Sequence, residues 1–230
     1  CQRLPVETPM IVITQALVLD PVETSPLSDQ PWIGWHNLVT AAGIAADTAA
    51  SGYPASNMAT AFTHRKWIAA STAQQYVPIK LKGVTQVDYL AIARHNLGSA
   101  KIPVSVEGYI GGVWTLLAGP VIPGDDAALI FRFAPQPLPQ MRVKLAPGTV
   151  PASISVVYAG KLLIMQRRIY AGHVPLPHAR KTRFVDGVTE GGNFMGRVQL
   201  RSWLASMAPF RQLTPDWSRA NLIPFLANGR

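Results

Sequence analysis

The sequence of 230 residues contains a single cysteine, Cys1, and no apolar run that approaches the roughly 20 residues of a membrane-spanning helix. One cysteine cannot form an intramolecular disulfide, so packing alone must hold the fold together. Residues 10–19 are apolar but are interrupted by Thr14 and Gln15, and no small-residue cleavage site follows them. This stretch therefore favours a β-strand over a signal peptide, and we expect no membrane insertion.

The motifs of common enzyme classes are also absent: there is no G-x-S-x-G elbow, no glycine-rich phosphate loop, no H-E-x-x-H and no C-x-x-C. Asp125 and Asp126 follow Gly124, as in an exposed turn rather than a catalytic pair. Prolines lie between His173 and His178, and no Cys, Asp or Glu follows at the spacing that zinc ligands usually have. We therefore expect no enzyme, no cofactor and no zinc site, whereas calcium bound by loop carbonyls would leave little trace in a sequence.

Positive charge is concentrated in the C-terminal third. Residues 1–160 contain ten Lys/Arg and nine Asp/Glu, whereas residues 161–230 contain eleven and three, for a formal net charge of +9. The densest basic region includes Arg167, Arg168, Arg180, Lys181 and Arg183. An arginine-rich protein interface is favoured over specific nucleic-acid binding, because no stacking-aromatic or groove-reading motif accompanies these residues. Charge alone leaves open a weaker alternative, the guidance of DNA through a lumen.

From about Tyr76 the chain consists of short alternating segments separated by Pro or Gly, which predicts an antiparallel sandwich. Within one segment Met141, Val143 and Leu145 share a face and the intervening basic residues share the other. The predicted strands are 76–81, 87–93, 102–109, 113–117, 128–134, 140–146, 153–159 and 162–165. Two packed sheets should form over residues 35–165, with Leu90, Ile92, Val104, Val106, Val143 and Leu145 inward. A short helical turn is expected at 54–61.

The segments on either side of the predicted sandwich differ from it. Residues 1–34 are expected to form a strand or arm, and residues 166–230 a basic extension. The extension should contain a hairpin within 178–202, turning at Gly187 or at Gly191-Gly192, and helices at 202–210 and 215–226. It has too few periodic apolar positions for a core of its own. It nevertheless contains aromatic residues that are costly to leave in water as a patch: Trp203, Phe210, Trp217 and Phe225.

Four segments resemble, in order and spacing, the discoidin-like, galactose-binding-type sandwich. They are 53–69 (YPASNMATAFTHRKWIA), 74–81 (QQYVPIKL), 87–97 (VDYLAIARHNL) and 104–117 (VSVEGYIGGVWTLL). The resemblance implies a mostly β chain with a galactose-binding-like jelly-roll β-sandwich, followed by an irregular, short-helix extension. In sandwich lectins the loops at one end bind sugar, which makes Trp67, His95 and Asn96 candidate glycan-binding residues. The favoured interpretation is structural: Trp67 fills the core, and Asn96 closes a turn.

A combination of segments that spans most of residues 30–226 resembles structural proteins of the tail tip or baseplate of tailed bacteriophages. The segments are 56–67 (SNM…W), 93–97 (ARHNL), 167–175 (RRIYAGHVP), 191–203 (GGNFMGRVQLRSW) and 210–225 (FRQLTPDWSRANLIPF). The resemblance implies a virion tail protein, assembled in the host cytoplasm with other phage tail proteins into a homo-oligomeric ring. The basic and aromatic residues of the extension would form the assembly interface. The alternative is a carbohydrate-binding module attached to a host-surface glycan, and the third hypothesis is an accessory domain of a polysaccharide-degrading enzyme.

Overall fold

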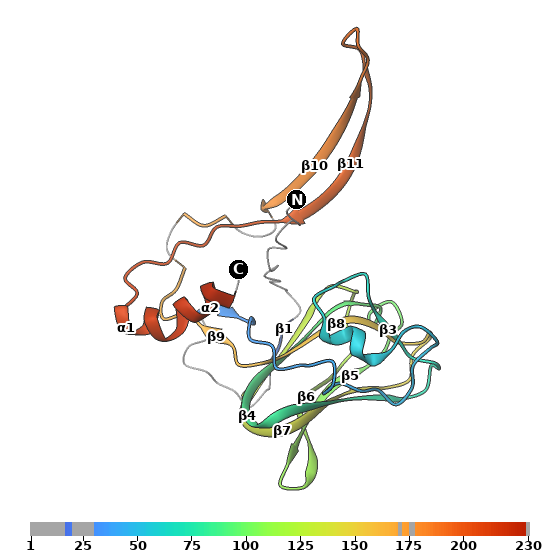
Figure 1. Ribbon diagram of the computed structural model, residues 1–230, viewed down its shortest axis with the longest axis vertical. Helices are drawn as coiled ribbons and strands as arrows, with labels where there is room; N and C mark the ends of the chain where they lie inside the picture. Colours follow the sequence, from blue (N-terminus) through green and yellow to red (C-terminus); the bar gives the residue numbers. More distant parts are fainter. Residues whose placement is uncertain (1–16, 20–29, 170–171, 175–177, 229–230) are drawn as a thin grey trace, which may run out of the picture.

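A computed structural model describes residues 17–19, 30–169, 172–174 and 178–228 (Figure 1). The chain is mostly β, a sandwich followed by a hairpin and a short helical segment, which confirms the predicted fold class. The strands are β1 (Leu17–Leu19), β2 (Trp32–Ile33), β3 (Trp67–Ile68), β4 (Gln75–His95), β5 (Val104–Ile110), β6 (Val113–Val121), β7 (Leu129–Leu145), β8 (Ser153–Gly160), β9 (Leu163–Ile164), β10 (Arg180–Val188) and β11 (Phe194–Leu204). The helices are η1 (Ala55–Ala59), α1 (Pro215–Trp217), η3 (Ser218–Leu222) and α2 (Ile223–Asn228).

Two long strands run through both layers of the sandwich. Residues 75–80 of β4 pair with 140–145 of β7, which in turn pair with β5. Further along, residues 87–92 of β4 pair with 129–136 of β7, and the end of β4 also pairs with β8. The hydrogen-bonded order β3-β8-β4-β7-β5-β6 is therefore continuous, and β1 adds parallel to β7. The two layers form by the bending of β4 and β7 rather than as separate sheets.

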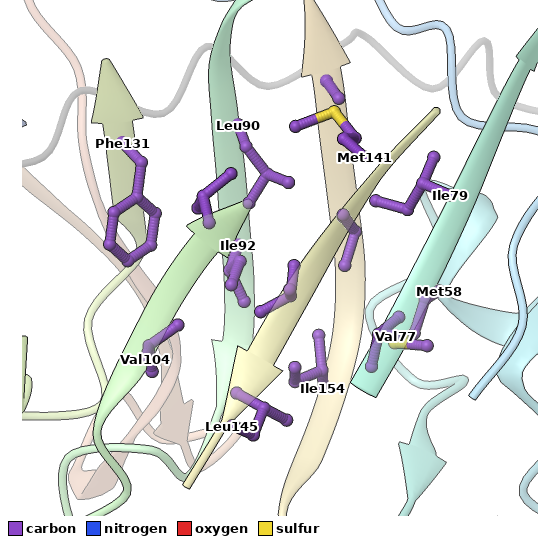
Figure 2. Packing of buried hydrophobic residues seen from close by; sticks show 14 of the residues in the cluster. Met58, Val77, Ile79, Leu90, Ile92, Val104, Phe131, Met141, Leu145 and Ile154 are labelled. Atoms are coloured by element: carbon purple, nitrogen blue, oxygen red, sulfur yellow. The ribbon is translucent and has the colours of Figure 1, made fainter. Parts of the chain in front are cut away.

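The core lies between these layers, where Figure 2 shows side chains from both sides meeting. Met141, Val143 and Leu145 are buried, while Arg142 and Lys144 between them are only partly covered. The residues predicted to point inward are all buried: Leu90, Ile92, Val104, Val106, Val143 and Leu145. Period-two alternation thus identified the core face of the central strands.

Several strand boundaries differ from those predicted. The expected strands at 76–81 and 87–93 are one strand, β4, and those at 128–134 and 140–146 are one strand, β7. Gly83 has a φ of 85°, and the pairing register shifts between Lys80 and Thr85, so the glycine lies in an irregularity within the strand rather than at its end. Pro137 pairs with Gln86 in a stretch of β7 with β4 as its only described neighbour. A stretch with a paired strand on one side only needs fewer backbone donors than a central strand, so a proline, which has none, is more easily tolerated there.

The extension forms the predicted hairpin, whose turn includes Gly191-Gly192 (Figure 1). The expected helix at 202–210 is wrong: residues 202–204 complete β11 by pairing with 180–182, and residues 205–214 are neither helix nor strand. Cross-strand pairing outweighed a weak local helix signal. The helical segment from Pro215 is confirmed, with the Thr214 hydroxyl accepting from the Trp217 N–H at 3.4 Å. Of the strand expected at 10–19, Leu17–Leu19 is a strand and the remainder lies outside the described residues.

The helical segment returns to the body of the protein. Gln166, just after β9, donates from Nε2 to the Thr214 hydroxyl at 2.9 Å and accepts from the Thr214 N–H at 2.8 Å. The Phe225 ring meets the Trp35 ring edge-on, with centroids 5.8 Å apart. The chain after the hairpin is therefore attached, through Thr214 and Phe225, close to β2 and β9, where the chain before the hairpin leaves the sandwich.

Asp88 and Arg132 are buried on adjacent strands beside this attachment. Asp88 accepts from the Leu162 N–H at 2.7 Å, and the Arg132 guanidinium lies 3.6 Å from the centroid of the Trp32 ring. Burial raises the pKa of Asp88 to about 6, and the Leu162 N–H and the nearby cations limit the rise.

Candidate functional site

Trp67 belongs to the core rather than to a sugar-binding surface. Its side chain is fully buried, and its indole Nε1 donates to the Thr48 carbonyl at 2.8 Å. Burying the ring removes a large apolar area from water, and the hydrogen bond satisfies its one donor. Trp67 presents no ring face to solvent, so this position corrects the expectation of an aromatic platform and agrees with the structural interpretation.

His95 and Asn96 connect strands at the same end of the sandwich. The Leu97 N–H donates to His95 Nδ1 at 3.1 Å, so Nδ1 is the acceptor and Nε2 donates to the Ala127 carbonyl at 2.7 Å. Burial lowers the pKa of His95, which favours this neutral ring. Asn96 donates from Nδ2 to the Pro151 carbonyl at 2.9 Å and accepts from the Ser153 N–H at 2.8 Å. Both side chains already use their polar atoms within the fold.

The carboxylate pair forms part of a turn. Asp126 accepts from the N–H groups of Gly98 and Ser99 at 3.0 and 2.9 Å, and Asp125 accepts from the Ala127 N–H at 3.0 Å. Desolvation alone would raise the pKa of Asp126, but the hydrogen bonds from Ser99 and Gly98 outweigh it and lower the pKa. A general acid at neutral pH needs the opposite shift, so the geometry does not support an acid–base pair here.

Within the described residues no three His, Cys, Asp or Glu side chains gather as a metal site, and His173 and His178 are exposed. No helix of the described chain has the length and apolar character to cross a membrane.

An exposed aromatic and basic cluster lies on the loop that leads into β3, which the sequence patterns did not single out. Tyr53 and Phe62 are 39% and 42% exposed. The Arg65 guanidinium lies 5.4 Å from the Phe62 ring, and the Lys66 ammonium 5.8 Å from the Tyr53 ring. The loop is anchored beneath them by buried Met58 in η1 and by the Asn57 amide, which donates to the Lys66 carbonyl at 2.9 Å. We call Tyr53, Phe62, His64, Arg65 and Lys66 the loop cluster.

A second aromatic group covers the outer face of β4, β5, β6 and β7. The Arg142 guanidinium lies 4.1 Å from the Tyr76 ring and 4.2 Å from the Trp114 ring, and its Nε donates to Glu107 at 2.6 Å. The Tyr109 ring meets the Trp114 ring at 5.1 Å. Arg142 links the rings of the neighbouring strands, so this group stabilises the sheet. Its rings are half-buried and offer a ligand less surface than the exposed rings of the loop cluster.

The hairpin of β10 and β11, hereafter the arm, is a two-stranded sheet that projects from the rest of the molecule (Figure 1). Its base is closed by the Ala205 N–H, which donates to the Ala179 carbonyl at 3.0 Å. Most of its large apolar side chains are exposed, with Phe194, Met195 and Val198 at 64%, 73% and 64%. Six further exposed apolar side chains of the arm are those of Phe184, Val185, Val188, Leu200, Trp203 and Leu204.

The expected assembly residues do not form one surface. Arg180, Lys181, Arg183 and Trp203 lie on the arm and are exposed. Arg167 and Arg168 precede it and are also exposed. Phe210, Trp217 and Phe225 follow it and are half-buried, and Phe225 packs against Trp35. The structure thus divides these residues between a projecting arm and a segment that packs back on the protein.

No family model and no curated protein matches the chain. Among solved structures it is similar to a chitosan-binding module derived from a chitosanase/glucanase of Paenibacillus sp. IK-5, at 17% identity over 55% of this chain and 100% of that one, with a TM-score of 0.48. It is also similar to a pectin-binding carbohydrate-binding module, at 14% identity over 55% and 93%, with a TM-score of 0.47. A Ruminococcus gnavus GH29 fucosidase matches at 21% identity over 57% and 27%, with a TM-score of 0.46. These neighbours include carbohydrate-binding modules and parts of glycoside hydrolases, and likenesses of this size assign no function.

Proposed function

We propose that this chain is a non-catalytic assembly protein that uses the arm to bind a partner protein. The observation that carries the proposal is the row of large apolar side chains that the arm exposes. Monomeric soluble proteins rarely expose an apolar patch of more than a few hundred Å², and larger patches mark interaction sites. Exposed aromatic residues beside arginines are also the composition found at protein interfaces.

The architecture of the arm supports the same conclusion. An isolated two-stranded hairpin is marginally stable in water, because it buries too little surface to offset its ordering. The described sandwich, by contrast, has a continuous core and needs no help from the arm. A long hairpin that adds nothing to that core gains its stabilising contacts from another molecule.

The resemblance of segments across residues 30–226 to tail-tip and baseplate proteins supports one setting for this function. In that setting the chain would be a structural component of a phage tail in the virion, assembled in the host cytoplasm and bound to other tail proteins. The basic extension after residue 165 would then be the assembly segment. A homo-oligomeric ring, which the same resemblance implies, would form through surfaces other than the arm.

Removal of the arm tests the proposal. Residues 180–204 can be replaced by a short Gly-Ser linker, since Ala179 and Ala205 already lie side by side at the base. The control replaces the exposed two-residue β5–β6 turn, Gly111-Gly112, by Asn-Gly, which suits the same type of hairpin turn. Tagged chains are produced in the native host, and their associated proteins are quantified by native mass spectrometry. The control should keep its associated proteins and the armless chain should lose them. An armless chain with an unchanged set contradicts the proposal.

Glycan binding is the second candidate function, and the loop cluster favours it. Sugars stack on exposed aromatic faces, and the adjacent Arg65, Lys66 and His64 suit an acidic sugar. Tyr53→Ala and Phe62→Ala are tested on an array of neutral and acidic oligosaccharides, with Phe184→Ala on the arm as the matched control. Binding to uronic-acid oligosaccharides that the loop variants lose and the control keeps would support a glycan site. An array without signal, or one that the loop variants leave unchanged, excludes this function for the loop cluster.

A further inference from the structure

The arm is apolar on both of its faces. Residues opposite each other in an antiparallel pair share a face, and neighbours along a strand alternate. The register pairs Val188 with Phe194, and Phe184 lies on the same face four residues earlier. It pairs Val185 with Val198 on the opposite face, where Lys181 pairs with Trp203. A hairpin that lies flat on a partner would need only one such face.

The charges of the two faces differ. On the first face Arg197 is paired with Asp186 through two hydrogen bonds of 2.6 and 3.1 Å, and its guanidinium also lies over the Phe184 ring. The second face carries three basic residues and no acidic one along its paired length: Lys181, Arg183 and Arg201. The first face is therefore nearly balanced in charge, whereas the second presents unbalanced positive charge among apolar side chains.

The described sandwich of a second copy carries more positive than negative charge. Residues 31–160 contain nine Lys/Arg and five Asp/Glu. Each of the five acids already has a partner within the fold: Asp47 with the Tyr76 N–H, Asp88 with the Leu162 N–H, Glu107 with Arg142, Asp125 with the Ala127 N–H, and Asp126 with the N–H groups of Gly98 and Ser99. Asp47, Asp125 and Asp126 are exposed, but the excess of basic residues makes a second copy a poorer match for the positive face of the arm than an acidic surface of a different chain.

Nucleic acid and lipid fit the arm less well. A phosphate backbone would neutralise the arginines but leave Val185, Val198 and Phe194 in water. Insertion into a bilayer would proceed through the turn, which carries Glu190 and Asn193 beside two glycines. A protein groove covers both apolar faces and supplies carboxylates.

From this geometry, and resting on the proposed function of the arm, we infer that the arm inserts into a groove of a different protein chain. One wall of the groove is apolar and meets Phe184, Val188 and Phe194. The other wall bears carboxylates and meets Lys181, Arg183 and Arg201 around Val185, Val198 and Trp203.

Phe184 and Val185 provide the test, because they are neighbours on one strand and point to opposite faces. A photo-crosslinking phenylalanine analogue is placed at each position in turn in the full chain, which is produced in its native host and irradiated. Mass spectrometry then identifies the crosslinked peptides. Insertion predicts that both positions link to the same foreign protein through different peptides, and that the peptide linked at Val185 contains Asp or Glu. A second pair of variants, Arg183→Glu and Arg201→Glu, should reduce that crosslink at least tenfold, whereas Arg180→Glu on the first face should reduce it less.

Each other outcome overturns the inference. Crosslinks from only one position indicate a flat docking surface, and crosslinks between copies indicate self-association. Crosslinks to lipid or nucleic acid indicate a different class of partner, and the absence of crosslinks from both positions indicates an uncovered arm. A one-sided crosslink to a foreign protein would leave the proposed assembly function standing, since removal of the arm tests that function separately.

Discussion

Asn96→Ala should destabilise the sandwich without touching any binding surface. The Asn96 amide links the end of β4 to the segment that enters β8, through Pro151 and Ser153. The backbone reinforces this link, since the Asn96 N–H donates to the Ser153 carbonyl at 3.2 Å. Alanine keeps the backbone hydrogen bond and removes both side-chain ones.

The magnitude follows from the two lost hydrogen bonds. A net contribution of about 1 kcal/mol each predicts a loss of about 2 kcal/mol in the free energy of unfolding. The loss is not larger because Pro151 and Ser153 are only half-buried, so water can replace part of what the amide supplied. For a protein of this size, the loss corresponds to a melting temperature lowered by roughly 4–8 °C.

The assay is urea unfolding and calorimetry of Asn96→Ala beside Asn193→Ala, the same change in the exposed turn of the arm. The control should unfold like the unmodified protein. If Asn96→Ala is as stable as the control, the two side-chain hydrogen bonds between Asn96 and the segment entering β8 contribute nothing to stability, and the structural interpretation of Asn96 fails. If glycan binding is lost while stability is unchanged, Asn96 acts on a ligand instead.

Three further predictions concern the sandwich. Because the folded-state pKa of Asp88, about 6, exceeds its ordinary value of 3.8, the folded protein holds this proton to a higher pH than the unfolded chain does, and stability should fall by about 2 kcal/mol as pH rises from 4 to 6. Asp88→Asn should flatten that slope in urea unfolding measured across this range, and an unchanged slope would show that another group causes it. Gly98→Ala would drive a Cβ into the Asp125 backbone and should cost about 3 kcal/mol by calorimetry, so a neutral effect would contradict the packing of that turn. Arg142→Leu should cost about 2 kcal/mol, and a double-mutant cycle with Glu107→Gln should recover part of it; strict additivity would exclude coupling.

The fold was predictable to the extent that one face of each strand is buried. Period two places Met141, Val143 and Leu145 inward because a slip of one residue would expose all of them. Strand ends were less predictable, because glycine and proline commonly mark the end of a strand, and Gly83 and Pro137 therefore predicted strand ends that do not exist. Pairing with the neighbouring strand carries the chain through both positions, and that contribution is non-local.

The sites were harder to predict because polar residues at strand ends serve the fold and ligands equally well. His95 and Asn96 have the chemistry of a binding site, yet their hydrogen bonds are to Ala127, Pro151 and Ser153. These partners lie 32 to 57 residues away along the chain, so no local pattern reveals them. The sequence patterns did not identify the loop cluster, because its aromatic residues lie in a segment without strand periodicity.

The attachment of the arm explains how a marginal hairpin can serve as a specific interface. Its base is closed by Ala179 and Ala205, and the segment beyond it is held by Gln166 on Thr214 and by Trp35 on Phe225. A partner therefore meets an arm whose root is already positioned, and the entropy lost on binding is confined to the arm itself. In the sandwich, buried polar groups such as His95 and Asp88 make their hydrogen bonds within the fold, so these contacts need no ligand to explain them. Under the proposed function, a partner would cover the exposed apolar side chains of the arm, such as Phe194, Met195 and Val198.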